Sequence, residues 1–110
     1  MKKKVAMIKK GEIHLVPFPF TDLSGSKLRP CVVLACDQED IKVVFVTSCK
    51  PKSGRSIEVL PSATNGIKVF SYIRYTKLAT IDRKMSLGSI GDLEEKIYRA
   101  VVRDVCDFLS

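Results

Sequence analysis

The chain has 110 residues, of which 45% are apolar, and a formal charge of +7 at neutral pH. This length suits one compact domain and is too short for two. No apolar run is long enough to cross a bilayer, and no apolar signal segment follows the lysine-rich start, so we expect a cytoplasmic protein.

The charge is unevenly distributed. Residues 92–110 hold five acids and three bases, a net of −2, whereas residues 1–91 hold 16 bases and seven acids, a net of +9. Such an excess favours a polyanionic partner such as nucleic acid, and a merely soluble basic protein is the alternative.

Residues 1–10 form a basic lead-in to the single domain, as a short edge strand or a solvated arm. Residues 12–16 alternate between apolar and polar, which predicts a strand with Glu12 and His14 on its polar face. His14 is therefore expected at a surface or groove. Since no second histidine could complete an acid-base pair, we interpret it as incidental.

Two prolines then interrupt the alternation. Pro17 and Pro19 remove two backbone donors and displace Phe18 and Phe20 from the regular pattern. Phe18 is either a core residue or, if it faces solvent, a platform on which an unpaired base stacks.

A polar loop follows, rich in residues that form turns. It lies between two strand-like segments and leads to Arg29, so it is the first place to look for function. Its candidate RNA-binding residues are Ser24, Ser26 and Lys27.

Two short apolar runs, Cys31–Cys36 and Val43–Val46, predict the central strands of a small barrel. The second run ends in Thr47 and Ser48, with Lys50 close behind. Two hydroxyls and a cation are thus expected where the sheet opens.

Further strands are predicted at residues 56–60, 68–75, 78–81 and 86–90. Asp92 resembles a helix N-cap with Glu95 closing a capping box, and the apolar residues that follow recur at helical spacing. The expected fold is mainly β, a partly closed antiparallel barrel of five to seven strands with a C-terminal α-helix.

The four cysteines form no CxxC pair. Three of them lie within apolar strand or helix patterns, so we interpret the cysteines as reduced and structural. Because zinc needs ligands at closer spacing and His14 lies apart from any cysteine pair, neither a metal nor a cofactor is expected. The four are Cys31, Cys36, Cys49 and Cys106.

Three segments carry a family resemblance: GEIHLVPFPFTDLSGSKLRPCVVLA, VVFVTS and KLATIDRKMSLGSIGDL. In this order and spacing they resemble the MazF/PemK family of toxin endoribonucleases of type II toxin-antitoxin systems. The likeness covers nearly the whole chain from Gly11. Its most specific elements are Arg29-Pro30 before an apolar strand and Thr47-Ser48 after the next.

The resemblance implies an SH3-like barrel that forms a homodimer, cleaves single-stranded RNA such as mRNA without a metal, and is held inactive by a cognate antitoxin. It assigns catalysis to Arg29 and Thr47. Many members have a glutamate-glutamine pair where this chain reads Ser24-Gly25-Ser26-Lys27. The base-contacting region also differs, reading Thr76-Lys77-Leu78-Ala79 here, so the family's base preference does not carry over.

These residue types suit the implied chemistry. RNA supplies its own nucleophile, the 2′-hydroxyl, so the enzyme has mainly to align the strand and neutralise charge. A guanidinium at Arg29 can hold two phosphate oxygens in a planar fork, while Thr47 donates a hydrogen bond and Ser48 assists. No group for proton transfer is identified, because the pKa of arginine is too high for a base.

Alternatives remain for each assignment. Arg29 could form a surface ion pair with Asp22 or Asp40, and Thr47 could be an ordinary threonine at a strand end. At the level of the whole protein, the rivals are a non-catalytic toxin on the same fold that inhibits DNA gyrase, and a passive RNA- or DNA-binding SH3-like module. The residues expected to bind the RNA backbone are Lys27, Lys50, Lys52, Arg55 and Lys77.

Overall fold

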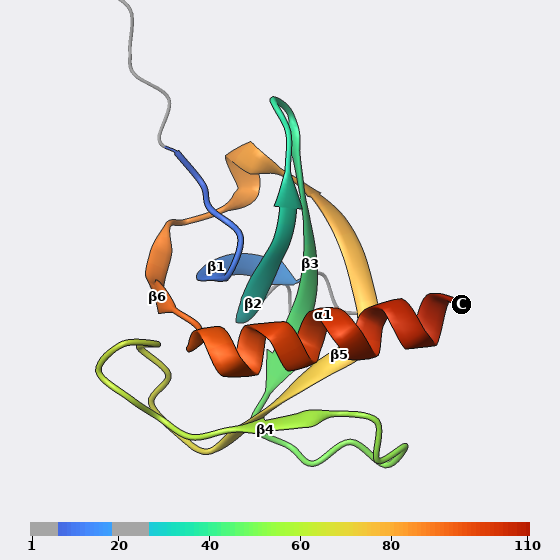
Figure 1. Cartoon of the computed structure of the whole chain (residues 1–110). Coiled ribbons are helices and arrows are strands. Elements are labelled where there is room, and N and C mark those ends of the chain that lie inside the picture. Colours follow the sequence, from blue (N-terminus) through green and yellow to red (C-terminus); the bar gives the residue numbers. More distant parts are fainter. Residues whose placement is uncertain (1–6, 19–26) are drawn as a thin grey trace, which may run out of the picture.

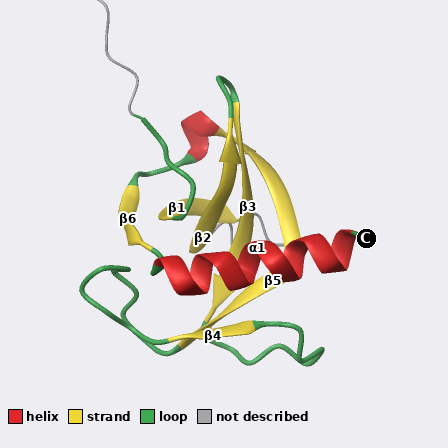
Figure 2. Ribbon diagram, in the orientation of Figure 1, coloured by secondary structure: helices red, strands yellow, loops and turns green. Residues whose placement is uncertain are grey.

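Alternating and continuous apolar segments build a curled antiparallel sheet in the computed structural model, which describes residues 7–18 and 27–110 (Figure 1). The strands are β1 (Glu12–Phe18), β2 (Lys27–Cys36), β3 (Asp40–Thr47), β4 (Ile57–Val59), β5 (Ser71–Asp82) and β6 (Ser89–Asp92). They form one sheet in the order β4-β5-β3-β2-β1-β6. A short 3-10 helix, η1 (Arg83–Met85), precedes β6, and α1 (Glu95–Leu109) ends the chain (Figure 2). The predicted mainly-β fold with a C-terminal helix is confirmed.

The sheet is buried on both faces, which explains why its central strands are continuously apolar. On one face, Val101 and Val105 of α1 pack against a cluster that includes Ile13, Val32 and Val44, and Figure 1 shows the helix lying across this face. The opposite face holds a second cluster, against which Ile8 packs. Its buried members are Val16, Cys31, Val33, Ile41, Val43 and Phe45.

Strand β5 replaces the two strands predicted at residues 68–75 and 78–81. Its register with β3 jumps from Val44↔Leu78 to Phe45↔Arg74, so three residues of β5, numbers 75–77, face no partner on β3. This β-bulge bends the strand, and the part before it also pairs with β4. The gap between the two predicted strands is therefore a β-bulge within one strand and not a turn between two.

The predicted capping box is wrong. Asp92 belongs to β6, where it pairs with Glu12 and its backbone N–H donates to the carbonyl of Thr64 over 2.8 Å. Helix α1 begins at Glu95 with Glu94 as its N-cap residue, and no side chain caps it. The final strand is correspondingly shifted towards the helix, from the expected residues 86–90 to Ser89–Asp92.

His14 is a buried residue and not the surface histidine that the sequence predicts. Only 4% of it is exposed. Its Nδ1 lies 2.6 Å from Ser86 Oγ and its Nε2 lies 2.8 Å from Glu12 Oε1. The ring therefore joins β1 to the segment that follows η1, and its polar atoms are satisfied within the fold.

The prediction that three cysteines pack as small hydrophobes is confirmed for Cys31 and wrong for the others. Only Cys31 is buried, and burial raises the pKa of its thiol to about 12. Cys36, Cys49 and Cys106 are exposed. Cys36 is the last residue of β2, Cys49 follows β3, and Cys106 lies on an exposed part of α1.

Candidate functional site

Strands β2 and β3 part at Pro30. Their paired register runs up to Cys31↔Phe45, and the next residue of β2 is this proline, which has no N–H to donate. Two residues beyond this last pair, Arg29 of β2 and Thr47 of β3 follow the alternation of their strands and lie on the same face as Cys31 and Phe45. Both line one pocket at the point where the two strands separate.

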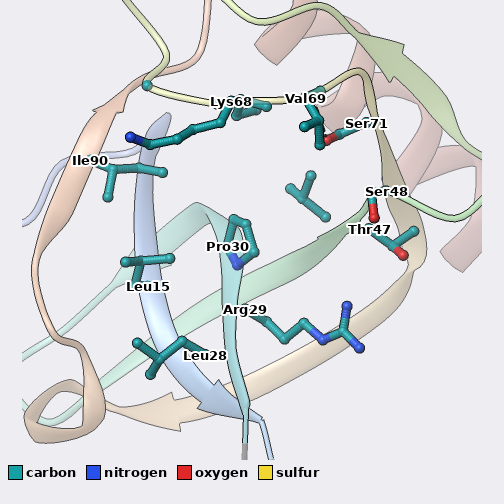
Figure 3. Close-up of a pocket in the computed structure, with 13 residues that line it drawn as sticks. Leu15, Leu28, Arg29, Pro30, Thr47, Ser48, Lys68, Val69, Ser71 and Ile90 are labelled. Atoms are coloured by element: carbon teal, nitrogen blue, oxygen red, sulfur yellow. Dashed lines mark hydrogen bonds between the residues drawn. The ribbon is translucent and has the colours of Figure 1, made fainter.

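A pocket of about 560 Å³ opens at this point (Figure 3). One side, here called the strand wall, comes from β1, β2, β3 and the residue after β3, and consists of Leu15, Leu28, Arg29, Pro30, Val46, Thr47 and Ser48. The opposite side, here called the loop wall, comes from residues 66–69 with Ser71. Ile90 of β6 completes the lining. The pocket is mainly apolar, and the polar groups of its strand wall are Arg29, Thr47 and Ser48.

Arg29 and Thr47 define the polar end. Figure 3 shows the guanidinium of Arg29 extending towards the side of the pocket where Thr47 and Ser48 lie. Thr47 Oγ1 accepts the backbone N–H of Cys49 over 3.1 Å, which orients the hydroxyl and leaves its proton available for donation. A permanent cation beside a hydroxyl donor suits an anionic group with several oxygens, such as a phosphodiester.

The loop wall is held by the side chain of Asn65, which is fully buried. Its Oδ1 accepts the backbone N–H groups of Ser62 and Ile67, over 3.1 and 2.9 Å. Its Nδ2 donates to the carbonyl of Leu60 over 2.9 Å and to Glu94 Oε1 over 3.3 Å. One amide thus fixes the turn whose following residues line the pocket.

Glu94 anchors the same turn to the start of α1. The hydroxyl of Ser62 donates to Glu94 Oε2 over 2.6 Å, and this bond, with a smaller contribution from Asn65, lowers the pKa of the Glu94 carboxyl. Hydrogen bonds to the charged form stabilise it, which is the direction observed. The loop wall and the helix are therefore connected through an ionised carboxylate.

A glycine allows the loop wall to approach β6. Gly66 has a φ of +70°, and a Cβ there would lie 2.1 Å from the backbone oxygen of Ile90. Any other residue at this position would be strained and would clash. Residues 66 and 90 can line one pocket only because the backbones touch.

The structure brings three of the predicted site residues together, namely Arg29, Thr47 and Ser48. Lys50 and Lys77 are exposed and do not line the pocket. The side chains of Phe18 and Lys27 lie outside the described part of the chain, as do Ser24 and Ser26 entirely. Their predicted roles stay predictions.

The alternative ion pair between Arg29 and Asp40 is excluded. Asp40 begins β3 and aligns with Asp82, at the end of the strand remote from Thr47. The other suggested partner, Asp22, is not among the described residues.

Sequence reasoning missed the loop wall. Lys68 and Ser71 line the pocket, and Figure 3 shows the Lys68 side chain stretching along one side of the pocket towards Ile90. The alternation through residues 68–75 indicated two faces but not which face borders a cavity. No three His, Cys, Asp or Glu side chains gather into a possible metal site within residues 7–18 and 27–110. Over the same ranges, no helix has the length and apolar character needed to span a membrane.

Comparisons with known proteins agree with this architecture. The sequence profile of a family described as PemK-like, MazF-like toxin of type II toxin-antitoxin system matches residues 9–109. The comparison with curated protein sequences gave no match.

Three solved structures show the same fold at low sequence identity. MazF from Deinococcus radiodurans aligns with a TM-score of 0.73 at 14% identity, covering 96% of this chain and 98% of that one. A MazF toxin of Mycobacterium tuberculosis aligns with a TM-score of 0.70 at 18% identity over 89% and 95% of the chains. An endoribonuclease in complex with its cognate antitoxin, from a mycobacterial species, aligns with a TM-score of 0.72 at 12% identity over 94% and 95%.

Proposed function

Because the chain belongs to the PemK-like, MazF-like toxin family of type II toxin-antitoxin systems, we propose that it is an endoribonuclease toxin that cleaves single-stranded RNA, including mRNA. One observation carries the proposal: the guanidinium of Arg29 and the hydroxyl of Thr47 share the polar end of one pocket. Transition-state charge is stabilised by donors fixed in advance, and strand-borne side chains meet that requirement.

The proposed reaction uses the 2′-hydroxyl of the RNA as nucleophile. Its oxygen attacks the adjacent phosphorus and loses its proton, while the 5′-oxygen of the next nucleotide leaves and gains one. The products are a 2′,3′-cyclic phosphate and a 5′-hydroxyl. Arg29 balances the negative charge that builds on the phosphate oxygens, and Thr47 donates a hydrogen bond to one of them.

This chemistry needs no metal ion in the proposal, since a guanidinium supplies the positive charge that a metal would otherwise bring. The apolar remainder of the pocket suits an unpaired base next to the cleaved bond, which favours single-stranded over duplex RNA. Ser48 is the auxiliary donor.

We further propose two protein partners, a cognate antitoxin and a second copy of this chain, for a toxin that acts in the cytoplasm. A solved relative with the same fold is described as an endoribonuclease in complex with its cognate antitoxin. The family assignment supports the homodimer and the antitoxin alike.

Chimeric oligonucleotides test the activity. Cleavage sites are first mapped on a long RNA with a chelator present, and a short strand containing one site is then compared with the same strand carrying a single 2′-deoxy residue there. We expect cleavage of the all-ribose strand, with a cyclic phosphate end, and none of the substituted strand. RNA binding without cleavage would support a passive module instead, and neither binding nor cleavage, with inhibition of gyrase, would support the non-catalytic toxin.

A further inference from the structure

Two aromatic side chains, Phe70 and Tyr72, lie at the start of β5, the strand that pairs with β3. Tyr72 aligns with Thr47 of β3, so these two side chains are neighbours on one face of the sheet. The Tyr72 ring meets the ring of Phe70 edge to face, with centroids 5.2 Å apart and an interplanar angle of 80°. This edge-to-face contact orders the two rings relative to each other.

The Phe70 ring is not a core residue. It is 40% exposed, and its neighbour Val69 is 56% exposed. Neither of the two buried clusters includes Phe70 or Tyr72. Val69 also lines the pocket, so the exposed Phe70 ring lies next to a pocket residue in the chain.

The charge around the pair suits a polyanion. Residues 47–77 contain six bases and one acid, a net of +5. The acid, Glu58, aligns with Tyr72 from the β4 side, away from Thr47. Arg74, two residues along β5, shares the face of Tyr72. The net positive charge of this region attracts an anionic strand, and Glu58 is its single acid.

We propose that Phe70 and Tyr72 form an aromatic platform on which the unpaired base next to the cleaved phosphate stacks. The platform rests on the proposed function, because it places the base relative to a phosphate held by Arg29 and Thr47. Stacking against fixed rings aligns the strand for in-line attack and requires no particular base, because every base has a π-face. Duplex RNA is rejected because its bases are already stacked on one another.

Binding measurements with a strand that cannot be cleaved test the platform. The strand carries a 2′-deoxy residue at a mapped cleavage site, and two further versions lack the base on one side or the other. We expect Phe70→Ala to weaken binding of the intact strand about 5- to 150-fold, in line with the effect of removing one stacking ring. Phe70→Leu, which keeps an apolar side chain but has no π-face, should lose a similar amount.

Phe108→Ala is the matched control, because Phe108 is 41% exposed but lies on α1, and it should bind like the unmodified protein. A double-mutant cycle between protein and RNA identifies the stacked base. If the removed base is the stacked one, the abasic strand should bind the unmodified protein as weakly as the intact strand binds Phe70→Ala. Phe70→Ala should then bind the abasic strand and the intact strand equally. Equal RNA affinities of Phe70→Ala and Phe108→Ala, or full RNA binding by Phe70→Leu, would overturn the platform. An RNA affinity of Phe70→Ala equal to that of the unmodified protein would point instead to a protein partner at this surface. Failure of the unmodified protein to bind RNA would instead overturn the proposed function.

Discussion

The two walls of the pocket are held by different forces. The strand wall presents Arg29 and Thr47 from β2 and β3, whose backbones are paired in the sheet and whose neighbours are buried on both faces. Residues 66–69 of the loop wall belong to no helix or strand, and their position depends on the side-chain bonds of Asn65 and Glu94. The proposed chemistry therefore lies on the rigid part of the molecule, while the shape of the pocket depends on a few replaceable hydrogen bonds.

If this comparison holds, the largest effect should come from removing charge on the strand wall. Arg29→Ala should lower the cleavage rate about 100- to 1000-fold, since one fixed donor to a developing negative charge is lost. The free energy of unfolding should change by less than about 1 kcal/mol, because the strand ladder does not need the guanidinium. Single-turnover cleavage and denaturant unfolding measure the two quantities.

Arg99→Ala provides the control for Arg29. Arg99 is an exposed arginine on α1 that pairs with Glu95, outside the pocket. Its removal should leave the cleavage rate within about twofold, given the small effects of exposed ion pairs. A comparable loss in both variants would mean that general basic charge, and not the placement of Arg29, supports cleavage.

Loosening the loop wall should have a smaller effect, and mainly on stability. Asn65→Ala removes the partner of two backbone N–H groups and one carbonyl in a buried turn, so the free energy of unfolding should fall by about 2–3 kcal/mol. RNA affinity should weaken more than the rate of the bound complex, because the wall is displaced while Arg29 and Thr47 keep their places. Urea unfolding and saturation kinetics distinguish the two.

Ser53→Ala is the reference for Asn65, since Ser53 accepts a backbone N–H from Arg55 in an exposed loop. It should cost less than about 0.5 kcal/mol. Equal stability losses in the two variants would show that the loop wall does not depend on a buried network.

The smallest effect concerns the Glu94 anchor and depends on pH. Hydrogen bonds from Ser62 and Asn65 lower the pKa of this carboxyl in the folded protein. The folded chain thus binds the proton less tightly than the unfolded chain, so the stabilisation is present above about pH 4.5 and is lost as the pH falls through the lower folded value. Glu94→Gln should reduce stability at neutral pH by less than about 1 kcal/mol and flatten this part of the pH profile. Unfolding experiments at several pH values between about 3 and 7, a range that includes the ordinary carboxyl pKa, measure this profile. If Glu94→Gln and the unmodified protein show the same dependence of stability on pH, Glu94 is not an anchor.

The same contrast explains what could be predicted from the sequence. Strand periodicity identified β2 and β3, and the order of Arg29-Pro30 and Thr47-Ser48 indicated the strand wall, because local pattern and register determine both. The loop wall was missed because only the fold brings Glu94, at the start of the helix, to the turn that Asn65 holds. His14 was misjudged for the same reason, since only the fold brings Ser86 to its ring.

The shared phosphate is the central claim, and a double-mutant cycle on cleavage tests it most directly. The rate of cleavage by Arg29→Ala, Thr47→Val and the combined variant is measured under single-turnover conditions on one mapped RNA site. Thr47→Val alone should cost about 10- to 100-fold, as expected for a lost hydrogen bond to a charged group. If both side chains act on one phosphate, the combined loss should fall short of the product of the single losses by about fivefold or more. A combined loss equal to that product would mean that the two residues act independently, and would contradict the account.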